Sequence, residues 1–195
     1  MSNQEIELVW HGPFRWYGTG DEALFSQPVV QMPGVYLWTV PIEGGLNVVY
    51  YVGESGVSFD YRLTEHTRCY LSGDYHVYDL EEFARGRRVM NWEGRMNAPQ
   101  SATLPEFLSR YHELGPQIYR MLGMFKVYLA PLQADKRVRR RIEGAIARSL
   151  YGQDGLAGQF QEKITYWFPL VNEEPILVKM KFPEPILGMS DELLA

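Results

Sequence analysis

The sequence is poor in cysteine and in long apolar runs. Its single cysteine, Cys69, excludes an internal disulfide and a cysteine-rich zinc site. No apolar run approaches the roughly 20 residues that a membrane-spanning helix needs, and the first ten residues have no basic segment followed by an apolar one. We therefore expect no membrane segment and no secretory signal, and a reducing, cytoplasmic location is the simplest interpretation.

A strong net charge is also absent, since the formal charge of the chain is −5. The charge is unevenly distributed, however. Residues 62–148 contain 15 Lys/Arg and 10 Asp/Glu, whereas the rest of the chain contains 4 Lys/Arg and 14 Asp/Glu. A basic middle region can present a positive face to a polyanion, although an ordinary solvated surface explains the same counts.

Apolar periodicity predicts a single α+β domain. Strands are expected at residues 5–10, 35–40, 46–52, 125–132 and 176–182, with the last at a sheet edge and 46–52 central in its sheet. Helices are expected at 58–71, 79–85, 104–122 and 135–151, with a break or kink at Gly115-Pro116. Strands 35–40 and 46–52 should form a hairpin, because the Gly44-Gly45 pair in the connection can take positive φ.

Residues 34–66 carry polar groups that packing does not require. Tyr36 and Tyr51 lie on the two strands of the hairpin, although tyrosines on strands usually serve packing. Tyr50 precedes Tyr51 and is expected on the opposite face of its strand. Arg62 and His66 are four residues apart and share one helix face, which a surface pair would also explain.

Glu143 and two groups of basic residues are further candidates. Glu143 lies at the margin of the buried stripe of helix 135–151, where an ion pair with Arg139 or Arg140 would also account for it. Arg87 and Arg88 precede Trp92, a mixture that suits phosphate contact with base stacking or a solvated loop with one anchoring tryptophan. Five of the six residues 136–141 are basic, Lys136 and Arg140 among them, which suits a phosphate backbone or a solvated helix face.

In this order, the motifs resemble those of the GIY-YIG nuclease family. Gly34-Val35-Tyr36 is similar to the GIY element, and Tyr51-Val52-Gly53 to the YIG element, with Val for Ile in both. Arg62, His66 and Glu143 match the family's arginine, histidine and glutamate. The resemblance covers about residues 33–151, with a core of 33–71 plus 124–151, an insertion at 72–123 and extensions at 1–32 and 152–195. It implies a small, mainly antiparallel three-stranded central sheet flanked by helices.

The resemblance also implies an activity, that of a metal-dependent DNA endonuclease of the restriction or mobile-element kind. Tyr36 would be the general base, assisted by His66, and Tyr51 would orient the water or the phosphate. Arg62 would hold the scissile phosphate, which its planar fork suits, and Glu143 would bind Mg²⁺ or Mn²⁺. Cutting both strands with one site per chain would favour a homodimer.

The sequence departs from the family pattern in three places. The 15 residues from Tyr36 to Tyr51 and the 77 from His66 to Glu143 are longer than the family's usual spacings. The family asparagine has no clear match among Gln153, Gln159 and Asn172. Two alternatives therefore stay open, a catalytically inactive module that binds nucleic acid or protein, and an unrelated α+β domain.

Overall fold

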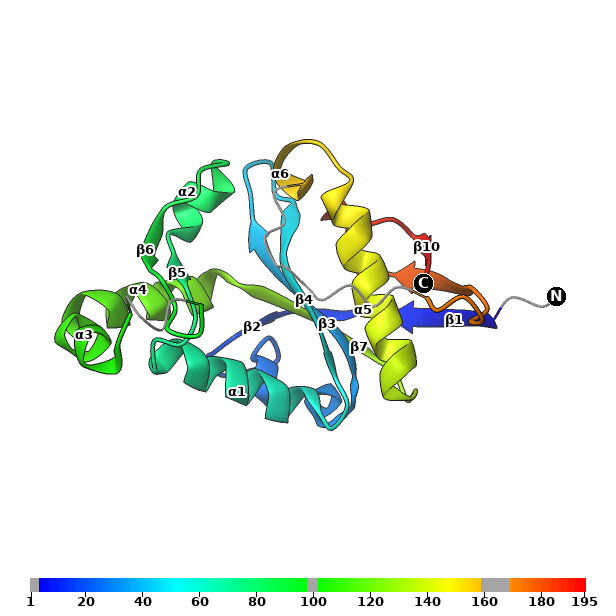
Figure 1. Ribbon diagram of the computed structural model, residues 1–195, viewed down its shortest axis with the longest axis horizontal. Coiled ribbons are helices and arrows are strands. Elements are labelled where there is room, and N and C mark those ends of the chain that lie inside the picture. The colour runs from blue at the N-terminus through cyan, green and yellow to red at the C-terminus, as the bar shows by residue number, and fades with distance from the viewer. Residues whose placement is uncertain (1–3, 98–101, 159–168) are drawn as a thin grey trace.

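The computed structural model describes residues 4–97, 102–158 and 169–195, and within them the chain adopts an α+β fold with mixed sheets and six α-helices (Figure 1). The strands are β1 (Gln4–Val9), β2 (His11–Arg15), β3 (Gly34–Pro41), β4 (Asn47–Ser55), β5 (Val77–Tyr78), β6 (Met90–Trp92), β7 (Lys126–Pro131), β8 (Ile176–Lys181), β9 (Ile186–Leu187) and β10 (Glu192–Leu194). The α-helices are α1 (Phe59–Leu71), α2 (Leu80–Ala84), α3 (Leu104–Ser109), α4 (Tyr111–Met124), α5 (Lys136–Tyr151) and α6 (Gly155–Gly158), and two short 3-10 helices, η1 (Leu24–Ser26) and η2 (Pro28–Gln31), precede β3. No helix in these ranges is long and apolar enough to cross a membrane.

The main sheet has five strands in the order β2-β7-β3-β4-β9 and curls into a half-barrel. The three strands predicted for the centre, β3, β4 and β7, are adjacent and antiparallel. The expected number of three is too small, because β2 from the N-terminal extension pairs with β7 and β9 from the C-terminal extension pairs with β4. The strand in the middle is β3, and β4 is an interior strand as predicted, because it lies between β3 and β9. Beside β4, β9 covers only Asn47 and Val48.

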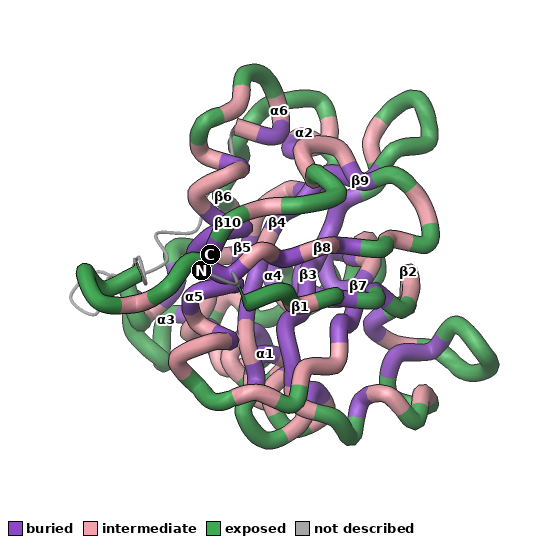
Figure 2. The backbone as a smooth tube through the Cα atoms, turned by 90° about the vertical axis from the view of Figure 1, so that its right-hand side faces the viewer, coloured by how far each residue is buried: buried purple, intermediate pink, exposed green. Residues whose placement is uncertain are grey.

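Each face of this sheet builds a separate hydrophobic core. Along β3, Val35 and Leu37 pack with α5 and the C-terminal strands, whereas Tyr36 and Trp38 pack with α1, α2 and α4. Side chains alternate across a strand, so a strand buried on both faces is apolar throughout. All of β3 except Pro41 is accordingly buried, as the purple tube in the middle of Figure 2 shows.

A β-bulge in β4 changes which side chains share a face. Trp38 pairs with Tyr51 and Thr39 with Val49, so Tyr50 is an extra residue opposite neither. Tyr50 and Tyr51 therefore both belong to the core on the α1 side. The expectation that they point to opposite faces is wrong, because it assumes an uninterrupted two-residue period.

The second sheet has three strands in the order β1-β8-β10, with β1 parallel and β10 antiparallel to β8. The predicted strand at 176–182 is thus the middle strand and not an edge. Pro175 and Pro183 lie just outside β8, so every backbone N–H within the strand remains available for pairing. This sheet lies beside α5, at the end of the molecule away from α1 (Figure 1).

The helix predicted at 104–122 is divided at Arg110 into α3 and α4, and it is not broken at Gly115-Pro116. Pro116 lies inside α4 and is exposed, and its missing N–H removes one backbone hydrogen bond from the helix. Leu114, Ile118 and Met121 are buried on one side of α4, and this packing holds the helix together across the proline.

Candidate active site

Three side chains form a hydrogen-bonded chain between β3 and α1. The Tyr36 hydroxyl lies 2.7 Å from His66 Nε2, and the Tyr75 hydroxyl lies 3.0 Å from His66 Nδ1. Tyr36 comes from β3, His66 from α1, and Tyr75 from the segment that follows α1. Because a neutral imidazole has one N–H and one bare nitrogen, one of these tyrosines donates to His66 and the other accepts from it. The histidine therefore connects the two hydroxyls.

Burial keeps these groups uncharged. It raises the pKa of Tyr36 well above its usual value, and Tyr51 raises it further while Arg62 opposes the shift. Burial lowers the pKa of His66 to about 3, and the positive charge of Arg62 contributes to this shift. At neutral pH, Tyr36 is therefore a phenol and His66 a neutral imidazole.

Tyr51 and Arg62 complete this side of the site. The ring of Tyr51 stacks on Trp38 with centroids 4.4 Å apart and lies 6.0 Å from the ring of Tyr36. Arg62, one turn before His66 on α1, interacts electrostatically with Tyr36 and Tyr51. Its guanidinium also pairs with Glu65 at 3.3 Å, and both side chains are more than a third exposed. An exposed pair of this kind is weak, so an anion can replace Glu65 at low cost.

Gly53 lies where the edge of β4 meets the Tyr36 hydroxyl. A Cβ at position 53 would be 2.8 Å from Tyr51 Cε1 and closer still to the hydroxyl oxygen of Tyr36. A side chain at this position would therefore push both tyrosines away. The glycine of the Tyr51-Val52-Gly53 motif has a steric role here, because the two rings occupy the space that its side chain would need.

Glu143 reaches the same edge of β4 from the other side of the sheet. Its carboxylate accepts a hydrogen bond from the backbone N–H of Glu54, which is accessible because β9 covers only the opposite end of β4. Burial raises the pKa of Glu143 to about 7, and the nearby Glu54 carboxylate adds to the shift, while Arg140 and Arg62 oppose it. Among the described residues, Glu143 forms no ion pair, so the predicted pairing with Arg139 or Arg140 on its own helix is not seen.

Glu54, and not Glu143, forms ion pairs with Arg139 and Arg140. Glu54 Oε2 lies 3.0 Å from Arg139 Nε, and Oε1 lies 3.5 Å from Arg140 Nε. The charge of Glu54 is thereby balanced, whereas that of Glu143 is not. The described residues contain no cluster of three or more His, Cys, Asp or Glu that could enclose a metal. One poorly neutralised carboxylate suits a cation that keeps most of its water ligands, as Mg²⁺ does.

The structure thus brings Tyr36, Tyr51, Arg62, His66 and Glu143 into one site beside β4. Sequence reasoning missed Tyr75 and the role of Glu54. No local pattern marks Tyr75, since its role depends on the turn at Gly73 that returns the chain toward His66. Glu54 directly follows the Tyr51-Val52-Gly53 motif, so its position next to that motif was a usable signal.

The four predicted nucleic-acid contacts are spread over several elements. Arg88 lines a cleft of about 610 Å³ beside Tyr51 and Tyr75, and Arg140 lies next to Glu54. Arg87 pairs with Glu82 near the end of α2, and Lys136 is exposed at the first turn of α5. Trp92 is buried and donates through Nε1 to the carbonyl of Gly73 at 2.8 Å, so it is the anchoring tryptophan and not a stacking platform.

The structure does not single out a counterpart of the family asparagine among Gln153, Gln159 and Asn172. The amide nitrogen of Gln153 donates to the carbonyl oxygens of Ser149 and Gly188, which ties α5 to the segment after β9. Asn172 is exposed in the turn before β8, and Gln159 lies outside the described residues.

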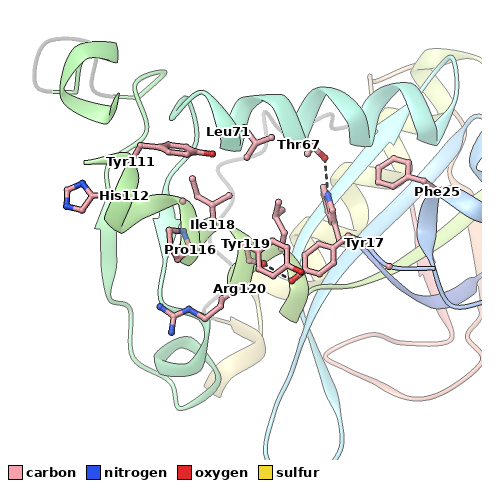
Figure 3. Close-up of a pocket in the computed structure, with 14 residues that line it drawn as sticks. Tyr17, Phe25, Thr67, Leu71, Tyr111, His112, Pro116, Ile118, Tyr119 and Arg120 are labelled. Carbon is pink, nitrogen blue, oxygen red and sulfur yellow. Dashed lines mark hydrogen bonds between the residues drawn. The ribbon is translucent and has the colours of Figure 1, made fainter. Parts of the chain in front are cut away.

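A larger, mostly apolar cavity of about 940 Å³ lies on the other side of α1, between α4 and the N-terminal extension. Figure 3 shows Tyr17, Tyr119 and Leu71 around it, with Trp16 donating to Thr67 at its wall. None of the five candidate site residues lines this cavity, so its size alone does not mark the site.

Comparison of the chain with models of protein families finds no match, and neither the curated proteins nor the solved structures yield one.

Proposed function

We propose that the chain is a metal-dependent endonuclease that hydrolyses phosphodiester bonds in DNA, with a GIY-YIG-like core. The convergence of Tyr36, Tyr51, Arg62, His66 and Glu143 on the edge of β4 supports this proposal. These residues are separated by up to 107 positions in the sequence, and only the fold brings them together. Phosphodiester hydrolysis needs a base, a phosphate clamp and charge neutralisation, and the five residues supply all three.

Arg62 binds the scissile phosphate in this proposal. Its guanidinium is always charged, and its planar fork matches two phosphate oxygens. Phosphate binding would displace Glu65, the exposed partner of Arg62. Tyr51, held by its stacking on Trp38, positions the nucleophilic water beside the phosphate.

Tyr36 does not readily form a phenolate, and His66 does not readily form an imidazolium. A proton relay through both residues allows the water to be deprotonated without either charged form. The water gives its proton to the oxygen of Tyr36 while the phenolic proton passes to His66 Nε2. In the same movement, His66 Nδ1–H passes its proton to Tyr75, whose own proton leaves to solvent in the cleft that Tyr75 lines. No phenolate or imidazolium accumulates, which is consistent with the raised pKa of Tyr36 and the lowered pKa of His66.

Glu143 would hold the divalent cation, Mg²⁺ or Mn²⁺. When bound, the metal supplies Lewis-acid stabilisation of the phosphate and of the leaving oxygen. The backbone N–H of Glu54 orients the Glu143 carboxylate, and Arg139 and Arg140 keep the Glu54 side chain from competing for the metal.

A plasmid-nicking assay tests the proposal. The wild-type protein should relax supercoiled plasmid with Mg²⁺ or Mn²⁺ and not with EDTA. Glu143→Ala and Arg62→Ala should each abolish relaxation, because they remove the cation site and the phosphate clamp. Arg68→Ala is the matched control, since Arg68 is an exposed arginine on the same helix. Cleavage that persists in EDTA or in Glu143→Ala would contradict the proposed mechanism.

The second candidate is an inactive binding module with the same core. Its support is the complete burial of the Tyr36 side chain, since a general base must reach a water molecule. In this case, DNA would bind in a gel-shift assay and Arg62→Ala would weaken binding, while no metal would give cleavage.

A further inference from the structure

Five of the 13 tyrosines in the chain gather around one cleft of about 610 Å³. We call it the tyrosine cleft; Tyr50, Tyr51, Tyr70, Tyr75 and Tyr78 line it, with Trp38 at the β3 wall. Its volume lies in the range of about 300–1,000 Å³ that is usual for small-molecule sites. The cleft adjoins the candidate active site, because Tyr51 and Tyr75 belong to both.

The walls of the tyrosine cleft come from distant parts of the chain. Tyr50 and Tyr51 face it together because the β4 bulge puts both rings on the same side of the sheet. Tyr75 and Tyr78 also line the cleft and come from the segment between α1 and α2. Tyr51, Tyr75 and Tyr78 are only half-buried, so these three rings present surface to the cleft.

A fixed polar group lies in the same cleft. His76 Nδ1 accepts a hydrogen bond from the backbone N–H of Gly94 at 2.9 Å. A neutral His76 therefore carries its proton on Nε2, 3.0 Å from the position of Asn97 Nδ2. Two donors cannot bond, so the carboxamide of Asn97 accepts this proton only in its flipped orientation, with its oxygen toward Nε2 and its NH2 group left for a ligand. A positioned side-chain amide combines a donor and an acceptor, which is what reading the edge of a base requires.

We propose that the tyrosine cleft binds an unpaired base of the DNA substrate, next to the scissile phosphate. The base would stack on the rings of Tyr75 and Tyr78, with its hydrogen-bonding edge toward Asn97 and its phosphate toward Arg88. Stacking on aromatic rings accepts any base, so the preference is for an unpaired nucleotide and not for a sequence. This inference rests on the proposed function, and it narrows the substrate to DNA that contains single-stranded, bulged or frayed positions.

Equilibrium binding in EDTA tests the inference without cleavage. The Glu143→Gln protein is titrated with three fluorescein-labelled DNAs at one fixed salt concentration: a matched duplex, the same duplex with one unpaired base, and the single strand. The two DNAs with an unpaired base should bind at least about 10-fold more tightly than the matched duplex, since loss of one base–aromatic stack typically costs this much.

Substitutions in the cleft locate this preference. Tyr78→Ala should weaken binding of the bulged duplex by roughly 5- to 100-fold and leave the matched duplex unchanged, whereas Tyr78→Phe, which keeps the ring, should restore binding. Asn97 is exposed, so Asn97→Ala should fold normally and still weaken binding of the bulged duplex. Tyr119→Ala is the matched control, because Tyr119 is an exposed tyrosine that lines the other cavity.

The outcomes separate the inference from the proposed function. If the wild type nicks plasmid but neither Tyr78→Ala nor Asn97→Ala changes the preference for unpaired bases, the inference is overturned and the nuclease stands. Equal affinity for matched and bulged duplexes overturns it as well. If binding of the bulged duplex depends on Tyr78 while no metal gives cleavage, the base site stands and the nuclease proposal fails.

Discussion

Gly53 is the residue at which the two halves of the candidate site meet, with the tyrosines on one side and Glu143 beyond Glu54 on the other. We predict that Gly53→Ala abolishes nicking, because the new Cβ would occupy the space of the Tyr36 hydroxyl and contact Tyr51. The backbone of Gly53 does not have a positive φ, so the substitution adds no backbone strain there. The measurement is the nicking rate, together with a thermal melt followed by circular dichroism.

Gly152→Ala is the control for this prediction. A Cβ at Gly152 would have its nearest neighbour at 3.9 Å, and its φ is −81°. This variant should cleave at the wild-type rate. Full activity in Gly53→Ala would mean that Tyr36 does not need its present position.

Glu143 is expected to lower stability in exchange for metal binding. In EDTA at pH 8, Glu143→Gln should raise the free energy of unfolding by up to about 3 kcal/mol, which is what a pKa shift from 4.5 to about 7 corresponds to. The folded state holds the proton more tightly than the unfolded state. The protonated Glu143 carboxyl therefore contributes its full stabilisation below pH 4.5, and the wild type loses this stabilisation as the pH rises through 7.

Urea denaturation at pH 4.5 and pH 8 measures this effect. The difference between Glu143→Gln and the wild type should be close to zero at the lower pH and largest at the higher one. Glu54→Gln is the matched control and should destabilise the fold, since Glu54 pairs with Arg139 and Arg140. A stabilising Glu54→Gln together with a neutral Glu143→Gln would show that the two carboxylates are wrongly assigned.

Tyr75 is the proposed exit of the proton relay. Tyr75→Phe keeps the ring and removes the hydroxyl that bonds His66 Nδ1, so we expect kcat for nicking to fall about 100-fold with little change in KM. The solvent deuterium isotope effect on kcat should change as well, because proton transfer then takes another route. Tyr78→Phe is the same substitution three residues later and should leave kcat unchanged. An unaltered kcat in Tyr75→Phe would exclude the relay.

At the scale of elements, Arg139 ties α5 to β4 and so fixes Glu143 relative to the tyrosines. Its side chain is 8% exposed and pairs with Glu54, which is 13% exposed. Arg139→Met should cost about 3–5 kcal/mol in urea denaturation, because it leaves a buried carboxylate without its main partner. The control is Arg15→Met, since Arg15 and Glu22 form a pair in which both side chains are at least 60% exposed, and its loss should cost less than about 1 kcal/mol. Similar costs for the two variants would contradict a tie through Arg139.

The longer helices and strands were predictable, whereas the short strands β2, β5, β6, β9 and β10 were not predicted. The hairpin and α1 follow from local signals, namely the Gly44-Gly45 turn and Ser58, whose side chain caps α1 by accepting from the Tyr61 N–H. The bulge at Tyr50 was not predictable, because it depends on how β3 and β4 align over several residues. The same holds for β8, whose central place is decided by β1, more than 160 residues earlier.

Only the part of the candidate site that lies in local sequence motifs was predictable from the sequence. Tyr36, Tyr51, Arg62 and His66 lie within 31 residues of one another, so their order along the chain carries a usable signal. Glu143 was singled out only through the family resemblance, because no local sequence feature distinguishes it from the other charged residues of its helix. The position of Tyr75 depends on the turn after α1. Sequence periodicity predicts helices and strands, but it does not predict the direction in which a turn leads the chain.

At the scale of the whole molecule, one chain contributes one candidate site, and a single site cuts one DNA strand at a time. If two copies act together on a duplex, the ratio of linear to nicked plasmid should rise with protein concentration, because the second strand is cut only when a second copy is bound. The measurement is the product distribution after equal fractions of supercoiled plasmid have been consumed, over a hundred-fold range of protein, with sedimentation velocity in parallel. A ratio that stays constant while the protein sediments as a monomer would mean that one copy acts alone. Mixing the wild type with Glu143→Gln sharpens the test: a dimer with one blocked site should nick but not linearise, so the linear product should fall more steeply than the total cleavage.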